Sequence, residues 1–383
     1  MIDIKANARG LVPEIMARRD EIERARRIPA DLNDRLVQAG LLRMLIPREI
    51  GGLELAPPDY VEVIELLAKA DASTGWCTMI AAVTCLKSAF LDRDVAQAVY
   101  GDPAAVHGGV FAPNGRADVD GEHYLVSGEW QWASGSANCT WLTGGALVYV
   151  DGELQRLPTG APAARQMLFP ADAVELGDDW NVSGLCGTGS GSMRVRNCRV
   201  PMSHSVSLVT DKQKFGGPLY AFPSFGMLAL GISVVAMGNA KGAVDDLIAL
   251  ANEKTPQGTR RVLAQRAQTQ TEVARSVAML RSARAYLLDA IATAWDQARY
   301  AGEISVATRA DLRLASTHVA RTSAEVCKTM YELGGGSSLF LSSPLQRRLR
   351  DALAASQHMM VAPPTLELTG RVLLGVDTDL TFL

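Results

Sequence analysis

The chain has 383 residues, of which 48% are hydrophobic and 21% charged, with a formal net charge of −3. This length exceeds what one hydrophobic core normally holds, so two or three domains are expected. The weak negative charge, without a basic stripe, argues against nucleic acid or an anionic membrane surface as a partner. Six cysteines without C-x-x-C or zinc-like spacing predict reduced thiols in a cytoplasmic protein and no metal site.

Residues 1–103 are predicted to form a helical domain. Apolar residues recur at near-helical spacing from Leu11 onwards, and Pro47 with the glycine pair that follows it ends this stretch. After a break with capping residues at 71–75, a nearly all-apolar helix is expected from Trp76 to Phe90. A helix that is apolar on all sides is normally buried.

Residues 104–215 are predicted to form a β domain, because short strands and turn dipeptides replace the helical pattern. The strand at 123–126 lies between Asp-Gly and Ser-Gly turns. The alternating segment 129–133 is expected to place Trp130 and Trp132 on one face. His107 is expected to begin a glycine-rich turn. About six or more such strands suggest a small barrel or sandwich.

Residues 216–383 are predicted to form a helical bundle. Four long helices with short connections are typical of one, and they are expected at about 225–251, 261–299, 305–333 and 345–360. The longest apolar run, Phe225 to Met237, is shorter than a membrane span and fits a buried helix better.

Two segments resemble the acyl-CoA dehydrogenase family. Residues 121–137 resemble its middle-domain hairpin that leads to Trp-x-Ser/Thr beside the flavin. Residues 332–340, followed by 344–351, resemble its Gly-Gly loop and Arg-x-x-Arg-Asp helix. The resemblance covers essentially the whole chain. It implies an α+β multidomain fold with an N-terminal helical domain, a middle β-barrel or sandwich and a C-terminal four-helix bundle.

The chain departs from that family at the catalytic base. Many acyl-CoA dehydrogenases carry a glutamate about two helical turns after the Arg-Asp pair, but no carboxylate lies between Asp351 and Glu367 here, and His358 occupies the region. Abstraction of an α-proton needs a positioned base. A histidine here resembles the two-component flavin-dependent aromatic monooxygenases of the same superfamily, the group D hydroxylase subunits. An acyl-CoA dehydrogenase with a displaced base and a non-catalytic flavin-binding protein remain the alternatives.

The resemblance to these monooxygenases implies a reaction and its partners. Such an enzyme receives reduced FMN or FAD from a separate flavin reductase. With O2 the flavin forms a C4a-hydroperoxide, which hydroxylates or oxygenates a small aromatic or heteroaromatic substrate such as a phenol or an indole. Because water would decompose that species, the site must be dry. A homotetramer is expected from the apolar face of 225–251 and the family's use of bundle helices as interfaces.

The resemblance also implies roles for individual residues. His107, Ser134 and His358 are the predicted catalytic residues, with Ser134 bonding the flavin through its hydroxyl or its backbone N–H. The predicted flavin contacts are Phe111, Pro113, Trp132, Ala133 and Ser134, together with Gly334, Gly335 and Gly336 near the cofactor of a neighbouring subunit. A helix C-cap is the alternative for these glycines. His107, Trp76 and Met227 are the predicted substrate contacts, with core packing as the alternative for the last two.

Overall fold

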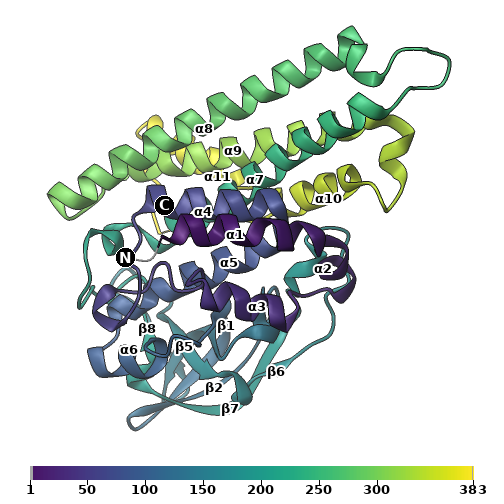
Figure 1. The fold of residues 1–383 in the computed structure, drawn as a ribbon. Coiled ribbons are helices and arrows are strands. Elements are labelled where there is room, and N and C mark those ends of the chain that lie inside the picture. The colour runs from purple at the N-terminus through teal and green to yellow at the C-terminus, as the bar shows by residue number, and fades with distance from the viewer. Residues whose placement is uncertain (1–2, 382) are drawn as a thin grey trace.

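The computed structural model describes residues 3–381 and Leu383, arranged in layers. The long C-terminal helices form one layer, the N-terminal helices a second, and the β-sheet lies on the far side of the N-terminal helices (Figure 1). The N-terminal helices are α1 Ile4–Ala17, α2 Arg19–Ala25, α3 Ala30–Gln38, α4 Pro57–Ala70, α5 Ala72–Thr84 and α6 Arg93–Tyr100, with a 3-10 helix, η2, at Cys85–Phe90.

Helix α5 begins earlier than the sequence pattern indicates. Asp71 is its N-cap, and the carboxylate accepts hydrogen bonds from the backbone N–H and hydroxyl of Thr74 at 2.7 and 2.8 Å. The polar residues at 73–74 were expected to separate two helices. They instead form the first turn of α5, where an Asp cap stabilises free N–H groups. The predicted helix 76–90 is in fact an α-helix followed by the tighter η2.

The described β-strands form one eight-stranded sheet, ordered β6-β7-β2-β1-β3-β5-β8, with β4 paired to β3. β1 and β3 are parallel, and the other pairs are antiparallel. The strands are β1 His107–Asp120, β2 His123–Trp130, β3 Trp141–Val150, β4 Glu153–Leu154, β5 Ala164–Pro170, β6 Glu175–Leu176, β7 Met193–Pro201 and β8 Ser205–Val206.

Two local predictions in the β region are wrong. His107 begins strand β1, where it pairs with Trp141, and is not part of a turn. Trp130 and Trp132 do not share a face, since Trp130 is fully buried while Trp132 is 66% exposed. Strand β2 ends at Trp130, and Trp132 has a left-handed φ of +66°, so the alternation of side chains stops between them.

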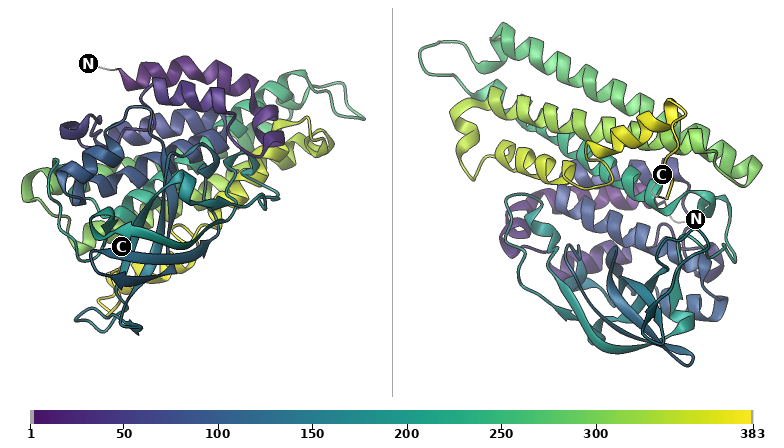
Figure 2. Two further views of the ribbon diagram at one scale, coloured as in Figure 1. Left: turned by 90° about the horizontal axis from the view of Figure 1, so that it is seen from below. Right: turned by 180° about the vertical axis from the view of Figure 1, so that it is seen from behind.

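The C-terminal layer contains helices α7 Ser224–Glu253, α8 Ala267–Ala301, α9 Val306–Gly334, α10 Pro344–Ser356 and the shorter α11 Pro364–Leu373, which the sequence pattern did not indicate (Figure 2). Helix α7 is long and apolar enough to cross a membrane by length and composition, but 94% of its most apolar window is buried inside the fold. Such burial is the behaviour of a core helix. Its small-residue face was expected to be an interface between subunits. It is instead covered by other helices of the same chain.

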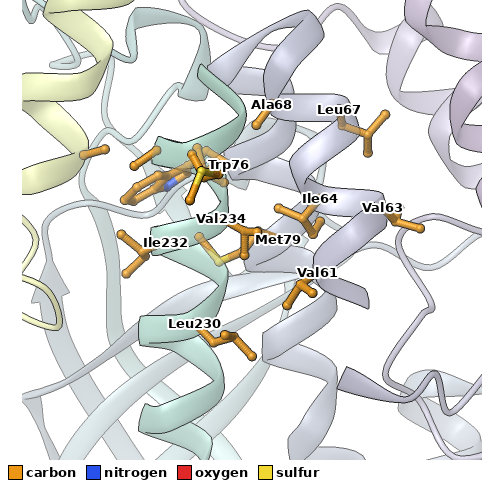
Figure 3. Packing of buried hydrophobic residues seen from close by; sticks show 14 of the residues in the cluster. Val61, Val63, Ile64, Leu67, Ala68, Trp76, Met79, Leu230, Ile232 and Val234 are labelled. Carbon is orange, nitrogen blue, oxygen red and sulfur yellow. The ribbon is translucent and has the colours of Figure 1, made fainter. Parts of the chain in front are cut away.

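Helix α5 lies between the other parts of the molecule. It packs on α4 and α7, and it also contacts β1. Trp76 and Met79 of α5 lie beside Ile232 and Val234 of α7 (Figure 3). One continuous hydrophobic cluster thus joins the N-terminal helices to the bundle, while the inner face of the sheet has a cluster of its own. This arrangement places α5 at the meeting point of all three parts.

The Arg-rich motif of α10 attaches the bundle to its surroundings. The guanidinium group of Arg348 pairs with Asp246 of α7 at 2.9 Å and donates to the carbonyl oxygen of Lys69 at 2.9 Å. Asp351 accepts a hydrogen bond from the backbone N–H of Leu185 at 2.7 Å, which ties α10 to the β region. Burial raises the pKa of this carboxyl group to about 7. The motif is therefore structural in this chain.

We predict that Arg348→Met lowers the free energy of unfolding by about 3–5 kcal/mol, because it leaves the half-buried Asp246 carboxylate without its close partner. Arg275→Met, which removes an exposed pair with Glu272 on α8, is the matched control and should change it by less than about 1 kcal/mol. Urea unfolding followed by circular dichroism measures both. Equal effects of the two substitutions would contradict the anchoring role of Arg348.

Candidate active site

Ser134 lies at the end of a chain of hydrogen-bonded hydroxyl groups. Its Oγ is 2.6 Å from Oγ of Ser190, which is 2.6 Å from Oγ1 of Thr188. Thr188 donates its only hydroxyl proton to the carbonyl oxygen of Leu185 at 2.8 Å. Since each hydroxyl carries one proton, Ser190 must donate to Thr188 and Ser134 must donate to Ser190. The hydroxyl proton of Ser134 is thus directed into the protein.

Trp76 connects Ser134 to the helical layers. Its indole Nε1–H donates to Oγ of Ser134 at 3.0 Å. The backbone N–H of Ser134 bonds the carbonyl oxygen of Trp132 at 2.9 Å. Both donors of Ser134, which were predicted to meet the flavin, therefore have internal partners here, and its Oγ offers one remaining acceptor position.

His358 also lies beside Trp76, in the turn that follows α10. The two ring centroids are 5.9 Å apart. Nδ1 of His358 accepts a hydrogen bond from the backbone N–H of Met360 at 3.2 Å, so the neutral ring carries its proton on Nε2. Burial, reinforced by the positive charge of Arg313, lowers the pKa of His358 to about 4. The structure thus brings a neutral imidazole and Ser134 to the same indole.

His107 is buried beside Ser134 at the start of β1. Its ring stacks on Tyr100 with centroids 4.2 Å apart, and its Nε2 has no hydrogen-bond partner. Burial lowers its pKa to about 3, with smaller contributions from Arg43 and Lys87. His107, Ser134 and Cys77 line one small pocket of about 20 Å³. That volume is enough for one water molecule, which could satisfy the free nitrogen.

The predicted flavin contacts of the β region gather at one end of the β1–β2 hairpin. The β1–β3 register shifts between Val110 and Gly115, so Phe111 and Pro113 lie on an irregular segment of the strand. Trp132 follows the end of β2, the strand that pairs with β1 beyond this irregular segment. The exposed indole of Trp132 is held at a positive φ, a conformation that bulky residues rarely adopt. A flat apolar surface beside Ser134 fits one face of a flavin ring.

Within one chain, the loop with Gly334, Gly335 and Gly336 lies apart from the predicted flavin contacts of the β region. Gly334 ends α9, its carbonyl accepts a hydrogen bond from Lys254 at 2.6 Å, and Gly335 has a φ of +56°. In this chain the loop connects α9 to α10 at one end of the bundle, where it ends the helix (Figure 1). Met227 is fully buried within the large hydrophobic cluster, as core packing requires.

Sequence reasoning missed two buried cations and the hydroxyl partners of Ser134. Lys87 is the one charged residue in the segment 76–90, a signal that the sequence did offer. Arg313 of α9 is buried, with Nε and Nη2 lacking hydrogen-bond partners. Ser190 carried no signal, because it lies 56 residues from Ser134 and meets it only in the folded chain.

The chain matches two family models, the acyl-CoA dehydrogenase N-terminal domain over residues 3–91 and the acyl-CoA dehydrogenase C-terminal domain over residues 230–363. It is 30% identical to indole-3-acetate monooxygenase of Pseudomonas putida over 94% of this chain and 90% of that protein. It is 28% identical to the flavin-dependent monooxygenase oxygenase subunit HsaA of Mycobacterium tuberculosis, over 91% and 89% of the two chains. A crystal structure of HsaA matches with a TM-score of 0.89 and 26% identity over 99% of each chain.

We predict that His107→Leu makes the protein less sensitive to acid. Between the unfolded pKa of about 6.5 and the folded pKa of about 3, the unfolded chain binds a proton that the native state does not, so stability falls as the pH falls. Between pH 7.5 and 5 this histidine costs the wild type about 2 kcal/mol. Urea unfolding of both proteins at these two pH values should show a smaller loss in the variant. An identical loss in both would contradict the buried neutral state of His107.

Proposed function

Because the chain belongs to the family of flavin-dependent monooxygenases built on the acyl-CoA dehydrogenase fold, we propose that it is the oxygenase component of a two-component system acting on small aromatic or heteroaromatic compounds. It is an oxidoreductase that depends on flavin. The relative named as an oxygenase subunit supports a separate reductase that supplies the reduced cofactor. The relative named for indole-3-acetate supports an indole-like or phenol-like ring as substrate.

The observation that carries this proposal is that the neutral His358 and Ser134 both lie next to the indole of Trp76. Many acyl-CoA dehydrogenases carry their carboxylate base in this region, and the segment between Asp351 and Glu367 has none. Asp351 itself is engaged by the backbone of Leu185. An imidazole with its proton on Nε2 can donate a hydrogen bond to an oxygen atom without carrying a charge at rest.

Reduced flavin, when bound, supplies the electrons that activate O2. Phe111 and Trp132 would flank its ring, and Ser134 would offer Oγ at its polar edge. Trp76 closes the side towards the bundle, where its indole holds Ser134 and lies against His358. His107 and Trp76 would contact the aromatic substrate. Nearly all of these groups are apolar or neutral, so the site can exclude water.

We predict that the wild type, mixed anaerobically with reduced FMN or FAD and then with oxygen and indole or a phenol, forms an oxygenated product. Product is identified by mass spectrometry and the flavin is followed by absorbance. A dye-reduction assay with acyl-CoA esters of several chain lengths is the counter-test. Turnover there at ordinary enzyme rates, on the order of 1–1000 per second, would favour the dehydrogenase alternative and contradict the proposal.

We predict that His358→Ala lowers product formation at least tenfold, since a general acid–base group typically contributes about 100- to 10,000-fold. Reduced flavin should still be consumed, and its electrons should appear as hydrogen peroxide. His318→Ala, at an exposed site on α9, is the matched control. If His358→Ala forms product with unchanged yield and rate, then His358 has no chemical role and Ser134 with His107 must carry it.

The proposal includes a homotetramer and a cytoplasmic location. The apolar face of α7 is already buried. An exposed apolar surface lies instead in the loop after α9, where Leu339, Phe340 and Leu341 are all exposed. An apolar patch of this kind is typical of an interface. The six free cysteines agree with a reducing compartment.

We predict that light scattering at micromolar concentration gives the mass of four chains. The double substitution Phe340→Glu with Leu341→Glu should shift the protein to smaller species, because charges cannot be buried at an apolar interface without a partner. Val209→Glu, at an exposed apolar residue outside this patch, should not. A wild-type monomer would contradict the assembly.

A further inference from the structure

Lys87 is a buried cation that nothing in the described chain neutralises. It lies in η2, is 2% exposed, and forms no hydrogen bond or ion pair with any described residue. Burying an ammonium group without a partner is costly, and most proteins avoid it. A lysine in such a place is expected to meet an anion that the chain itself does not supply.

The surroundings of Lys87 are aromatic. Its Nζ lies 4.6 Å from the centroid of the Phe111 ring, and that ring is 6.0 Å from the ring of Phe225 at the start of α7. Phe111 is also one of the predicted flavin contacts. A cation over an aromatic face gains only about 0.5–2 kcal/mol, which does not offset the burial of its charge. The site therefore combines flat apolar walls with one unsatisfied positive charge.

Lys87 shares a side of its helix with Trp76. Positions 76, 80, 83 and 87 are separated by three or four residues, so their side chains lie along one face of α5 and η2. The axial rise between Trp76 and Lys87 is about 18 Å. Because helical side chains lean towards the N-terminus, the ammonium group reaches back towards Trp76. One face of this helix thus carries the His358 and Ser134 contacts at one end and the cation at the other.

The neighbouring positive groups are not equivalent to Lys87. Arg43 donates to the carbonyl oxygens of Tyr100 and Asp102 at 2.8 and 2.6 Å, so its guanidinium group is engaged. His107 is neutral. Desolvation lowers the pKa of Lys87 to about 7, and an anion bound beside it would raise that pKa and restore its charge. Arg313 also lacks partners for two of its nitrogens, but it lies on α9 and acts on His358.

We propose that Lys87 binds a carboxylate carried on the side chain of the aromatic substrate, so that the enzyme selects aromatic acids over their neutral analogues. The aromatic ring would lie beside Trp76 and be directed towards His358, with the carboxylate at η2. Only the identity of the ring as a substrate rests on the proposed function. Recognition of the carboxylate is a property of the binding site alone.

The test compares two ligands that differ in one charge, indole-3-acetate and indole-3-acetamide. Calorimetric titration of the anaerobic protein with reduced flavin should give at least tenfold tighter binding of the acid, as a charge-assisted hydrogen bond in a buried site provides. Lys87→Met should remove this preference. It should weaken binding of the acid at least tenfold and change binding of the amide by less than about threefold. Lys87→Arg should retain part of it.

Two control substitutions locate the effect. Lys214→Met removes an exposed lysine that pairs with Asp92 and whose backbone bonds η2, and it should leave the preference unchanged. Arg313→Met should also retain the preference. The inference is wrong if the wild type binds acid and amide equally, if Lys87→Met keeps the preference, or if Arg313→Met alone abolishes it. Binding of the acid that depends on Lys87 without any oxygenation would contradict the proposed function and leave this inference standing.

Discussion

The hydrogen bond from Trp76 to Ser134 is the contact on which the geometry of the site depends. It joins α5 to the turn after β2 at 3.0 Å, and the same indole lies 5.9 Å from the ring of His358. Helix α5 can occupy this place because its apolar faces pack on α4 and α7 while it also contacts β1. Three regions far apart in sequence thereby each contribute one side chain, Trp76, Ser134 or His358, to the same place in the fold.

The electrostatic character of the site follows from burial. His107 and His358 are both neutral at physiological pH, because desolvation disfavours the imidazolium form. The hydroxyl chain from Ser134 to Thr188 directs its protons away from the site. Two basic side chains, those of Lys87 and Arg313, are also buried, and two nitrogens of Arg313 lack hydrogen-bond partners among the described residues. Such a site suits a reaction in which negative charge arrives with the substrate or develops on oxygen.

Much of the fold could be predicted because its signals are local. Helical spacing, turn dipeptides and the Trp-x-Ser and Arg-Asp motifs indicated the order of helical, β and helical regions, and the family is confirmed by the comparisons. The outcome at Trp132 could not be predicted, because the left-handed turn that exposes it depends on bonds to residues 188–191. The aromatic surroundings of Lys87 could not be predicted either, because they form only when Phe111 and the start of α7 meet near η2 in the folded chain.

The central claim is that an oxygen atom from O2 is transferred to an aromatic ring in this neutral, dry site. Isotope labelling tests it most directly. With reduced flavin, indole-3-acetate and 18O2 in ordinary water, mass spectrometry of the product should show one 18O atom per oxygenation, and 18O-labelled water with ordinary O2 should introduce none into that position. A product whose oxygen comes from water, or a wild type that consumes reduced flavin and O2 and releases only hydrogen peroxide with indole-3-acetate, other indoles and phenols, would contradict this account.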